Sequence, residues 1–170
     1  KDKRSITISG THGKTTTTSI IGQLLQDDAI DPTVVSGGIM NINNSNLIFG
    51  NGDWMVVEAD ESDGSFLILP SEISIITNID NDHLDYYKSM KLLKDAFIKY
   101  ANNTPENGCL IVCIDDEGVQ SILNDIKVKR LISYGFSEKA NYQVSFIKTS
   151  LLGSIFSVKC NLPDTYLEIG

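Results

Sequence analysis

Within residues 1–135, the pattern of apolar and polar positions predicts strands that alternate with helices. Arg4–Ile8 alternates polar and apolar residues, whereas Trp54–Glu58 and Ile73–Thr77 are almost continuously apolar. Unbroken apolar runs are typical of parallel strands that are buried on both faces. Further strands are expected at Thr33–Ser36, Leu47–Phe49, Cys109–Cys113 and Leu131–Tyr134. The expected fold class is therefore α/β, with a mostly parallel sheet flanked by helices.

Three segments between these strands repeat apolar residues at helical spacing. The first helix is expected to begin at Gly13 and to end before Pro32. Its inward face is predicted to carry Thr17, Ile20, Ile21, Leu24 and Leu25. The second helix is predicted to bury Met90, Leu93, Phe97, Tyr100 and Ala101, and the third Val119, Ile122, Leu123 and Ile126.

The pattern changes after Gly135. Alternating segments follow at Tyr142–Lys148, Ser154–Cys160 and Tyr166–Ile169, without a helical repeat between them. This arrangement is typical of a small antiparallel meander. We therefore expect an α/β core over residues 1–135 and an antiparallel β appendage over residues 136–170. The chain starts at Lys1 without a methionine, so we expect it to be part of a longer protein.

The composition restricts the class of protein. Hydrophobic residues make up 41% of the 170 residues and charged residues 21%, as in ordinary globular proteins. No apolar run is long enough to span a membrane, so no membrane partner is expected. The formal net charge of −8 argues against a nucleic-acid partner. Cys109, Cys113 and Cys160 lack the spacing of a zinc site and are expected to be buried, reduced thiols of a cytoplasmic protein.

A glycine-rich turn, residues 9–16, joins the first strand to the first helix and contains Gly-Lys-Thr. Glycines let backbone N–H groups surround anionic oxygens, and a helix N-terminus attracts negative charge. Lys14 is expected to reach the β- and γ-phosphates of a nucleotide, and Thr15 to bind Mg²⁺. The general pattern has glycine where this chain has Ile8, so the loop is a shorter variant. The alternative is a tight turn with a solvated lysine.

Acidic residues and a histidine follow two further strands. Glu58 ends one apolar strand, and His83 lies in the loop after Ile73–Thr77. Ligands of open α/β sheets bind outside the carboxyl ends of strands, so Glu58 is expected to complete the Mg²⁺ shell begun by Thr15. His83 is expected to bind a second metal ion or to contact a phosphate. A solvated acidic turn is an equally good interpretation of Asp60, Glu61 and Asp63.

Three motifs in this order resemble the Mur ligase family, the ATP-dependent enzymes that form the amide bonds of the peptidoglycan stem peptide. The motifs are residues 10–16, 58–63 and 82–85. His12 is similar to the branch whose acceptor is UDP-N-acetylmuramate, and the other two motifs resemble the member that adds L-alanine. The tail after Gly135 matches the central domain of the family in layout.

The resemblance implies that residues 1–170 are the central ATP-binding domain of a three-domain cytoplasmic ligase. ATP would phosphorylate the carboxylate of UDP-N-acetylmuramate, and the amine of L-alanine would attack the acyl phosphate. Lys14, Glu58 and His83 would be catalytic, and Mg²⁺ would be held by Thr15, Glu58 and His83. Some relatives carry a carbamylated lysine at the second metal, and that role is not assigned to Lys88. The nucleotide loop would comprise Gly10, Thr11, His12, Gly13, Lys14, Thr15 and Thr16.

Other functions fit parts of the pattern. A recycling ligase that joins a tripeptide to the same UDP-sugar would share His12 and Glu58, but Ser62 and residues 78–85 are closer to the L-alanine enzyme. A nucleotide switch without chemistry needs the phosphate loop but not Glu58 and His83 together. A structural domain with a vestigial loop is disfavoured by the intact Gly-Lys-Thr sequence.

Overall fold

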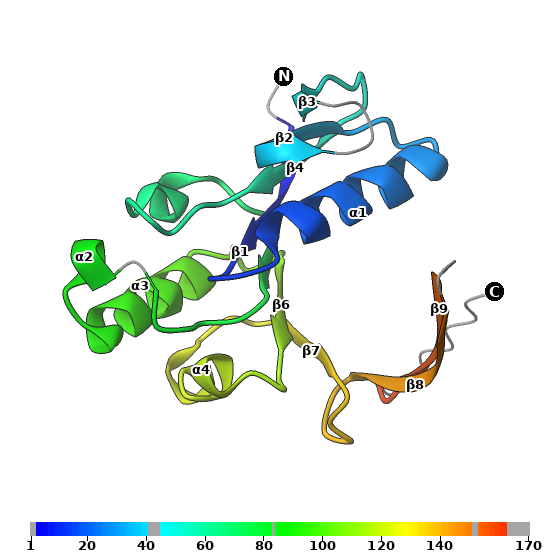
Figure 1. Ribbon diagram of the computed structural model, residues 1–170. Coiled ribbons are helices and arrows are strands. Elements are labelled where there is room, and N and C mark those ends of the chain that lie inside the picture. The colour runs from blue at the N-terminus through cyan, green and yellow to red at the C-terminus, as the bar shows by residue number, and fades with distance from the viewer. Residues whose placement is uncertain (1–2, 41–44, 83, 151–152, 163–170) are drawn as a thin grey trace.

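The computed structural model describes residues 3–40, 45–82, 84–150 and 153–162, and within them one mixed sheet forms the framework (Figure 1). Its strand order is β3-β2-β4-β1-β5-β6-β7-β8-β9. Neighbouring strands from β2 to β8 are parallel, whereas β3 and β9 pair antiparallel at the two edges. The strands are β1 (Arg4–Ser9), β2 (Thr33–Met40), β3 (Ser45–Ile48), β4 (Trp54–Glu58), β5 (Ile73–Ile76), β6 (Cys109–Cys113), β7 (Leu131–Gly135), β8 (Tyr142–Ser150) and β9 (Gly153–Cys160). The expected α/β class is confirmed.

Helices cover the sheet on opposite faces, as right-handed crossovers require. Helix α1 (Lys14–Asp27) lies on one face, and α3 (Met90–Asn102) lies on the other (Figure 1). The face with α3 also carries α2, α4 and two 3₁₀ turns. These shorter elements are α2 (Leu84–Tyr87), α4 (Glu117–Gln120), η1 (Ser65–Ile68) and η2 (Leu123–Asp125).

The inward face of α1 differs from the expected one. Ile20 and Leu24 are 54% and 59% exposed, whereas Thr18 and Gly22 are buried. A Cβ atom on Gly22 would lie 2.8 Å from Cγ2 of Val34, so the helix rests closely on β2. Small residues set this contact, and a prediction based on hydrophobicity alone passes over them. The prediction that Ile20 and Leu24 face inward is therefore wrong, although Ile21 and Leu25 do pack against the core.

The third expected helix is also shorter than predicted. It ends after one turn at Gln120 and is followed by the separate 3₁₀ turn η2. Asp116 caps the turn by accepting a hydrogen bond from the Val119 backbone at 2.8 Å, and the Ser121 hydroxyl donates to the Gly118 carbonyl. Ile126 then adopts an extended conformation. Local hydrogen bonds thus compete with continuation of the helix.

The larger core lies between the sheet and α3, and aromatic rings fill its centre. Phe66 and Phe97 are fully buried, with ring centroids 5.4 Å apart in an edge-on arrangement. Tyr100 stacks on Phe66 at 5.1 Å. The aromatic contacts join η1 to α3 and so fix the segment that follows β4 against the sheet.

We predict that Phe97→Ala lowers the free energy of unfolding by about 3–5 kcal/mol, because the buried ring leaves a cavity. Urea denaturation of the chain measures the change. Phe136→Ala is the matched control, since the Phe136 side chain is 63% exposed and its removal is expected to change stability by less than about 0.5 kcal/mol. Equal losses in the two variants would contradict the assignment of Phe97 to the core.

The C-terminal strands continue the main sheet. β8 pairs with β7 in parallel through Tyr134↔Tyr142 and Gly135↔Gln143, and β9 pairs with β8 antiparallel. The expected antiparallel pair is confirmed, and the expected third strand, Tyr166–Ile169, lies outside the described residues.

The three cysteines are free thiols. Cys109 is buried as expected, but Cys113 and Cys160 are only partly buried. Within the described ranges, the helices are all too short or too polar to cross a membrane.

Candidate nucleotide-binding site

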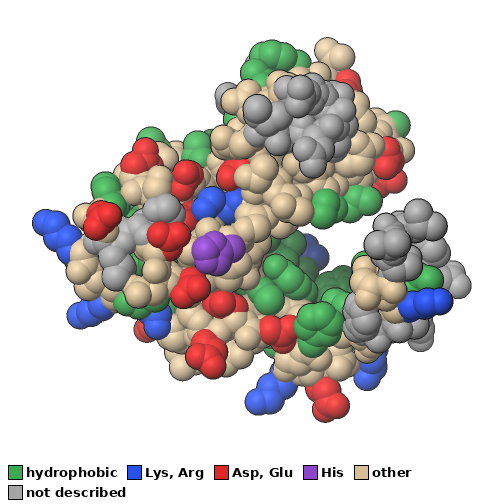
Figure 2. All heavy atoms as spheres, in the orientation of Figure 1, with side chains coloured by type: hydrophobic (Ala, Val, Ile, Leu, Met, Phe, Trp, Pro, Cys, Tyr) green, Lys and Arg blue, Asp and Glu red, His purple; other side chains and the backbone are tan. Residues whose placement is uncertain are grey.

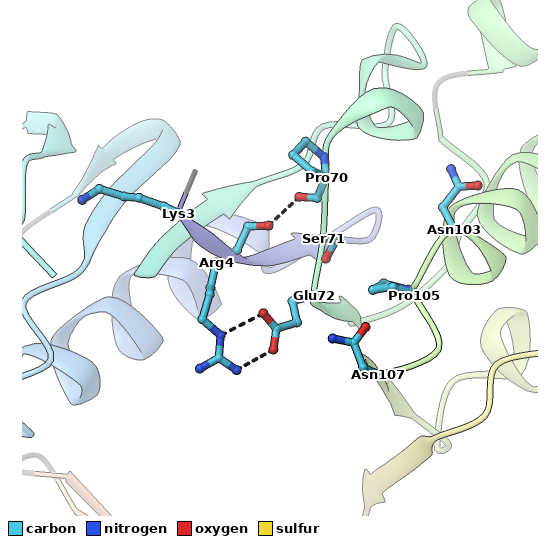
Figure 3. Close-up of a pocket in the computed structure, with 9 residues that line it drawn as sticks. Lys3, Arg4, Pro70, Ser71, Glu72, Asn103, Pro105 and Asn107 are labelled. Carbon is cyan, nitrogen blue, oxygen red and sulfur yellow. Dashed lines mark hydrogen bonds and ion pairs between the residues drawn. The ribbon is translucent and has the colours of Figure 1, made fainter. Parts of the chain in front are cut away.

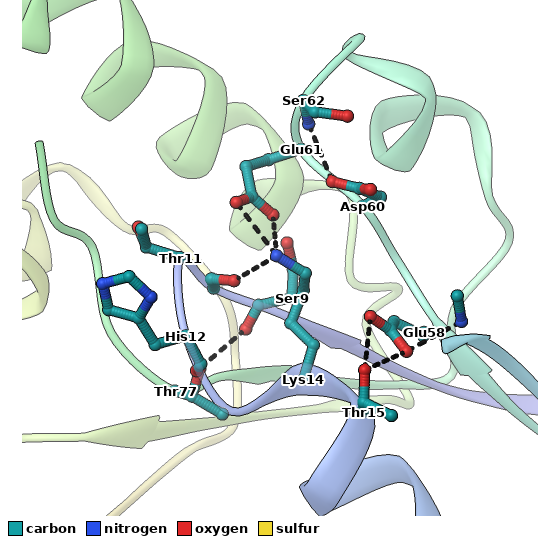
Figure 4. Close-up of polar contacts among 12 residues, drawn as sticks. Ser9, Thr11, His12, Lys14, Thr15, Glu58, Asp60, Glu61, Ser62 and Thr77 are labelled. Atoms are coloured by element: carbon teal, nitrogen blue, oxygen red, sulfur yellow. Dashed lines mark hydrogen bonds and ion pairs between the residues drawn. The ribbon is translucent and has the colours of Figure 1, made fainter. Parts of the chain in front are cut away.

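Three adjacent strands place the candidate site residues at the carboxyl ends of the sheet strands. β1 lies between β4 and β5, and its register pairs Ile8 with Glu58 and Ser9 with Ile76. The loop after β1 therefore meets Glu58 on one side and the loop after β5 on the other (Figure 4). Open α/β sheets bind ligands at these carboxyl ends of the strands.

Two glycines give the phosphate loop its shape. Gly10 and Gly13 adopt φ angles of +138° and +83°, which residues with a side chain rarely adopt. A Cβ atom on Gly10 would also lie 2.1 Å from Oγ1 of Thr77. Gly13 is the N-cap of α1 and has no side chain that could accept a hydrogen bond. The first backbone N–H groups of the helix therefore lack a side-chain cap. Such a helix end attracts phosphate.

The phosphate loop is held by residues of the loop after β5. Asn78 accepts a hydrogen bond from the His12 backbone N–H at 2.8 Å and donates to the His12 carbonyl at 2.9 Å. The Thr77 hydroxyl donates to the same carbonyl at 2.8 Å. The Thr11 hydroxyl accepts from the Asp80 backbone N–H at 2.9 Å. The conformation of the loop thus depends on two side chains that the sequence motif does not include.

Lys14 lies between the loop and a buried carboxylate. Its Nζ is 2.8 Å from the Gly10 carbonyl oxygen and 3.0 and 2.9 Å from Oε1 and Oε2 of Glu61 (Figure 4). The Lys14 side chain is 11% exposed and that of Glu61 is fully buried. The alternative of a solvated lysine is therefore wrong, and so is the alternative of a solvated turn at Glu61.

Thr15 and Glu58 form the candidate Mg²⁺ site. The Thr15 hydroxyl donates to both carboxylate oxygens of Glu58, at 3.1 and 3.0 Å. Mg²⁺ takes oxygen ligands at about 2.1 Å in an octahedral shell, so neighbouring ligand atoms lie about 3.0 Å apart. The spacing of these oxygens fits that shell. Ser36 and Gly37 also donate to Glu58, each at 2.8 Å, and fix its carboxylate.

Of the two histidines, the structure describes only His12. The His12 ring is exposed beside Asp80, with Nε2 3.7 Å from the carboxylate, and the backbone of His12 forms part of the loop. Figure 2 shows acidic side chains around the histidine on this face. His83 lies outside the described residues, so its expected metal role stays a prediction. Among the described residues, no group of three or more histidine, cysteine, aspartate or glutamate side chains is arranged to hold a metal ion.

The turn after Glu58 is built from local hydrogen bonds. Asp60 accepts from the Ser62 backbone and Asp63 from the Ser65 backbone, and the bonds to Ser65 hold the pKa of Asp63 below its usual value. Both carboxylates serve the turn rather than the phosphate loop. Thr16, assigned to the nucleotide loop, is exposed on the first turn of α1.

A pocket lies at the opposite end of the strands from the phosphate loop. Its volume is about 440 Å³, and Arg4 forms a paired hydrogen bond with the Glu72 carboxylate at its wall (Figure 3). The Arg4 guanidinium also stacks 3.9 Å above the Trp54 ring. These groups satisfy one another, and the pocket lies at the amino ends of the strands, away from the phosphate loop.

Comparison with known proteins gives three consistent findings. A family model described as the Mur ligase middle domain matches residues 8–165. A UDP-N-acetylmuramate–L-alanine ligase of Rhodopseudomonas palustris (strain BisB5) is 46% identical over 156 residues, which is 92% of this chain and 33% of that protein. The enzyme of the same name from Pelagibacter ubique (strain HTCC1062) is 41% identical over 160 residues, 94% of this chain and 34% of that protein. The chain spans about a third of the length of these relatives.

Solved structures agree with the fold. The UDP-N-acetylmuramate–alanine ligase of Thermotoga maritima is 32% identical with a TM-score of 0.69, over 84% of this chain and 31% of that one. A ligase from Neisseria meningitidis named for UDP-N-acetylmuramate and a tripeptide has a TM-score of 0.81 at 20% identity, over 94% of this chain and 53% of that one. At that identity the likeness concerns the fold alone.

Proposed function

The chain belongs to the Mur ligase family, and from this membership we propose that it is the ATP-binding domain of a ligase that joins L-alanine to UDP-N-acetylmuramate. The observation that carries the proposal is the meeting of Lys14, Thr15 and Glu58 at the carboxyl ends of β1 and β4. The identity of 41–46% to relatives that bear this name supports the choice of substrates. We place the reaction in the cytoplasm, where nucleotide-linked precursors and ATP meet.

The proposed reaction has two chemical steps. A carboxylate oxygen of UDP-N-acetylmuramate forms a bond to the γ-phosphorus of ATP, while the bond to the bridging oxygen of ADP breaks. The amine of L-alanine then forms a bond to the acyl carbon, inorganic phosphate leaves with the electrons of the C–O bond, and the amine proton passes to solvent. Both steps depend on position and on neutralisation of charge.

Each residue of the site has a role that follows from its geometry. The loop from Gly10 to Gly13 and the first turn of α1 would surround the β-phosphate with backbone N–H groups. Lys14 would bring a positive charge to the γ-phosphate, in a position from which water is largely excluded. Thr15 and Glu58 would hold Mg²⁺, which when bound neutralises phosphate charge. His83 is proposed as the ligand of a second Mg²⁺.

The same site allows two other functions, and one experiment separates them. The full-length protein is assayed for phosphate release from ATP with UDP-N-acetylmuramate, L-alanine and the tripeptide, each alone, and with UDP-N-acetylmuramate together with either L-alanine or the tripeptide. Release that requires both substrates supports the proposed function. Release that requires the tripeptide instead of L-alanine identifies a recycling ligase, and release that depends on neither identifies a nucleotide switch. The amino-acid site is expected in a part of the protein beyond this chain, because the relatives are about three times as long.

A further inference from the structure

The described contacts of Lys14 use all of its hydrogen-bond donors. An ammonium group has three N–H donors. The carbonyl oxygen of Gly10 and the two carboxylate oxygens of Glu61 lie 2.8, 3.0 and 2.9 Å from Nζ. A phosphate oxygen therefore gains a hydrogen bond from Lys14 only by replacing one of these acceptors.

Glu61 is the acceptor that can yield without releasing the lysine. The Gly10 carbonyl belongs to the backbone of the phosphate loop, and that loop is fixed to Asn78 through His12. Glu61 instead presents two equivalent oxygens. If one oxygen gives way to a phosphate, the other still holds the ammonium, which then remains anchored at two points beside the γ-phosphate.

The structure around Glu61 buries its side chain and holds its backbone in place. The Glu61 side chain is fully buried, and its backbone carbonyl accepts hydrogen bonds from the Tyr87 hydroxyl and from the Gly64 backbone N–H. Burial raises the pKa of Tyr87 to about 12, which moves the titration of this hydroxyl donor further above neutral pH. The aromatic core beneath η1 fixes the next residues of the chain.

We propose that Glu61 is a positioning residue that holds the Lys14 ammonium at the γ-phosphate and exchanges one of its two contacts for the nucleotide, an inference that rests on the proposed function. A carboxylate at this place has two opposite effects. Its negative charge weakens the attraction between the site and a phosphate, and its oxygens fix the ammonium in one location. Charge governs how tightly the nucleotide binds, whereas a fixed location governs how well the transition state is stabilised.

The two effects give Glu61→Gln a distinctive signature in the full-length protein. We expect kcat to fall at least about tenfold, because a displaced catalytic group loses its alignment. We expect the Kd of the non-hydrolysable analogue AMP-PNP with Mg²⁺ to stay within twofold or to fall, because a negative charge has been removed. Glu61→Asp keeps the charge on a shorter side chain and is expected to recover part of the lost kcat. Phosphate release gives kcat, and calorimetric titration gives Kd.

Glu72→Gln is the matched control. It also removes a carboxylate that is paired with a cation, Arg4, but the pair lies at the amino ends of the strands, away from the phosphate loop. Its kcat and Kd are expected to equal those of the wild type. The proposal is wrong if Glu61→Gln retains kcat within twofold, or if its Kd rises by the same factor by which kcat falls. If Glu61→Gln does not fold, Glu61→Asp decides the matter: a lower kcat with an unchanged Kd supports the proposal, and a kcat equal to that of the wild type, or a Kd that rises by the same factor by which kcat falls, refutes it.

The titration with AMP-PNP needs neither UDP-N-acetylmuramate nor L-alanine. A wild-type protein that binds AMP-PNP but does not ligate these substrates refutes the proposed function. In that case Glu61 is judged on Kd alone, and a tenfold weaker affinity in Glu61→Gln counts against its positioning role.

Discussion

Replacement of Lys14 by alanine is expected to lower kcat for ATP-dependent ligation on the order of a thousandfold, which corresponds to about 4 kcal/mol of transition-state stabilisation. Lys14 is held at the N-terminus of α1 by the Gly10 carbonyl and Glu61, and in the proposed function it is the cation at the γ-phosphate. Phosphate release by the full-length protein with both substrates measures the effect. Near-normal turnover in this variant would remove Lys14 from the mechanism.

The same substitution has a second effect, on stability. It leaves the fully buried carboxylate of Glu61 without the ammonium of Lys14, and breaking a buried ion pair typically costs about 3–5 kcal/mol. The double variant Lys14→Ala/Glu61→Gln is the control, because it removes the buried negative charge as well. We expect the double variant to regain stability in urea denaturation without regaining turnover. Recovery of turnover would show that the loss in Lys14→Ala came from unfolding.

Glu58→Ala is expected to raise the Mg²⁺ concentration for half-maximal activity at least about tenfold, because a metal site loses its charged oxygen ligand. A titration of activity against Mg²⁺ at saturating ATP measures the change. Asp60→Asn is the control, since Asp60 follows Glu58 closely but caps the backbone of Ser62. His83→Ala is expected to change the Mg²⁺ dependence in the same direction. An unchanged dependence in both Glu58 and His83 variants would make these residues structural.

The sequence predicts the parts of this site that are encoded locally. Gly10, Gly13, Lys14 and Thr15 form one contiguous motif, and Glu58 stands at the end of an apolar run. The hydrophobic pattern locates the ends of the strands, and ligands of parallel sheets bind outside the carboxyl ends of strands. These residues can therefore be found from the sequence. The sheet and its mostly parallel order follow from the same alternation of strands and helices.

The remaining parts depend on contacts between distant segments. Glu61 lies 47 residues from Lys14 and Asn78 lies 66 residues from His12 along the chain. Neither residue has a local pattern that distinguishes it from a solvated acid or a turn asparagine. The inward face of α1 was misjudged for a related reason, since the close fit of Gly22 against Val34 exists only after the helix has packed.

The register between β1 and β4 has a consequence for how this site tolerates change over evolution. Ile8 and Glu58 are paired across adjacent parallel strands, so the separation of the phosphate loop from Glu58 is set by backbone hydrogen bonds of the sheet. β2 itself holds the Glu58 carboxylate through Ser36 and Gly37, but the chain between β2 and β4 passes through β3, which lies at the edge of the sheet. Connections of this kind lie at the surface and accept insertions and deletions at a small entropic cost. The edge strand β3 and its connection to β4 are therefore free to drift in length and sequence, while the two anchors of the nucleotide site keep their spacing.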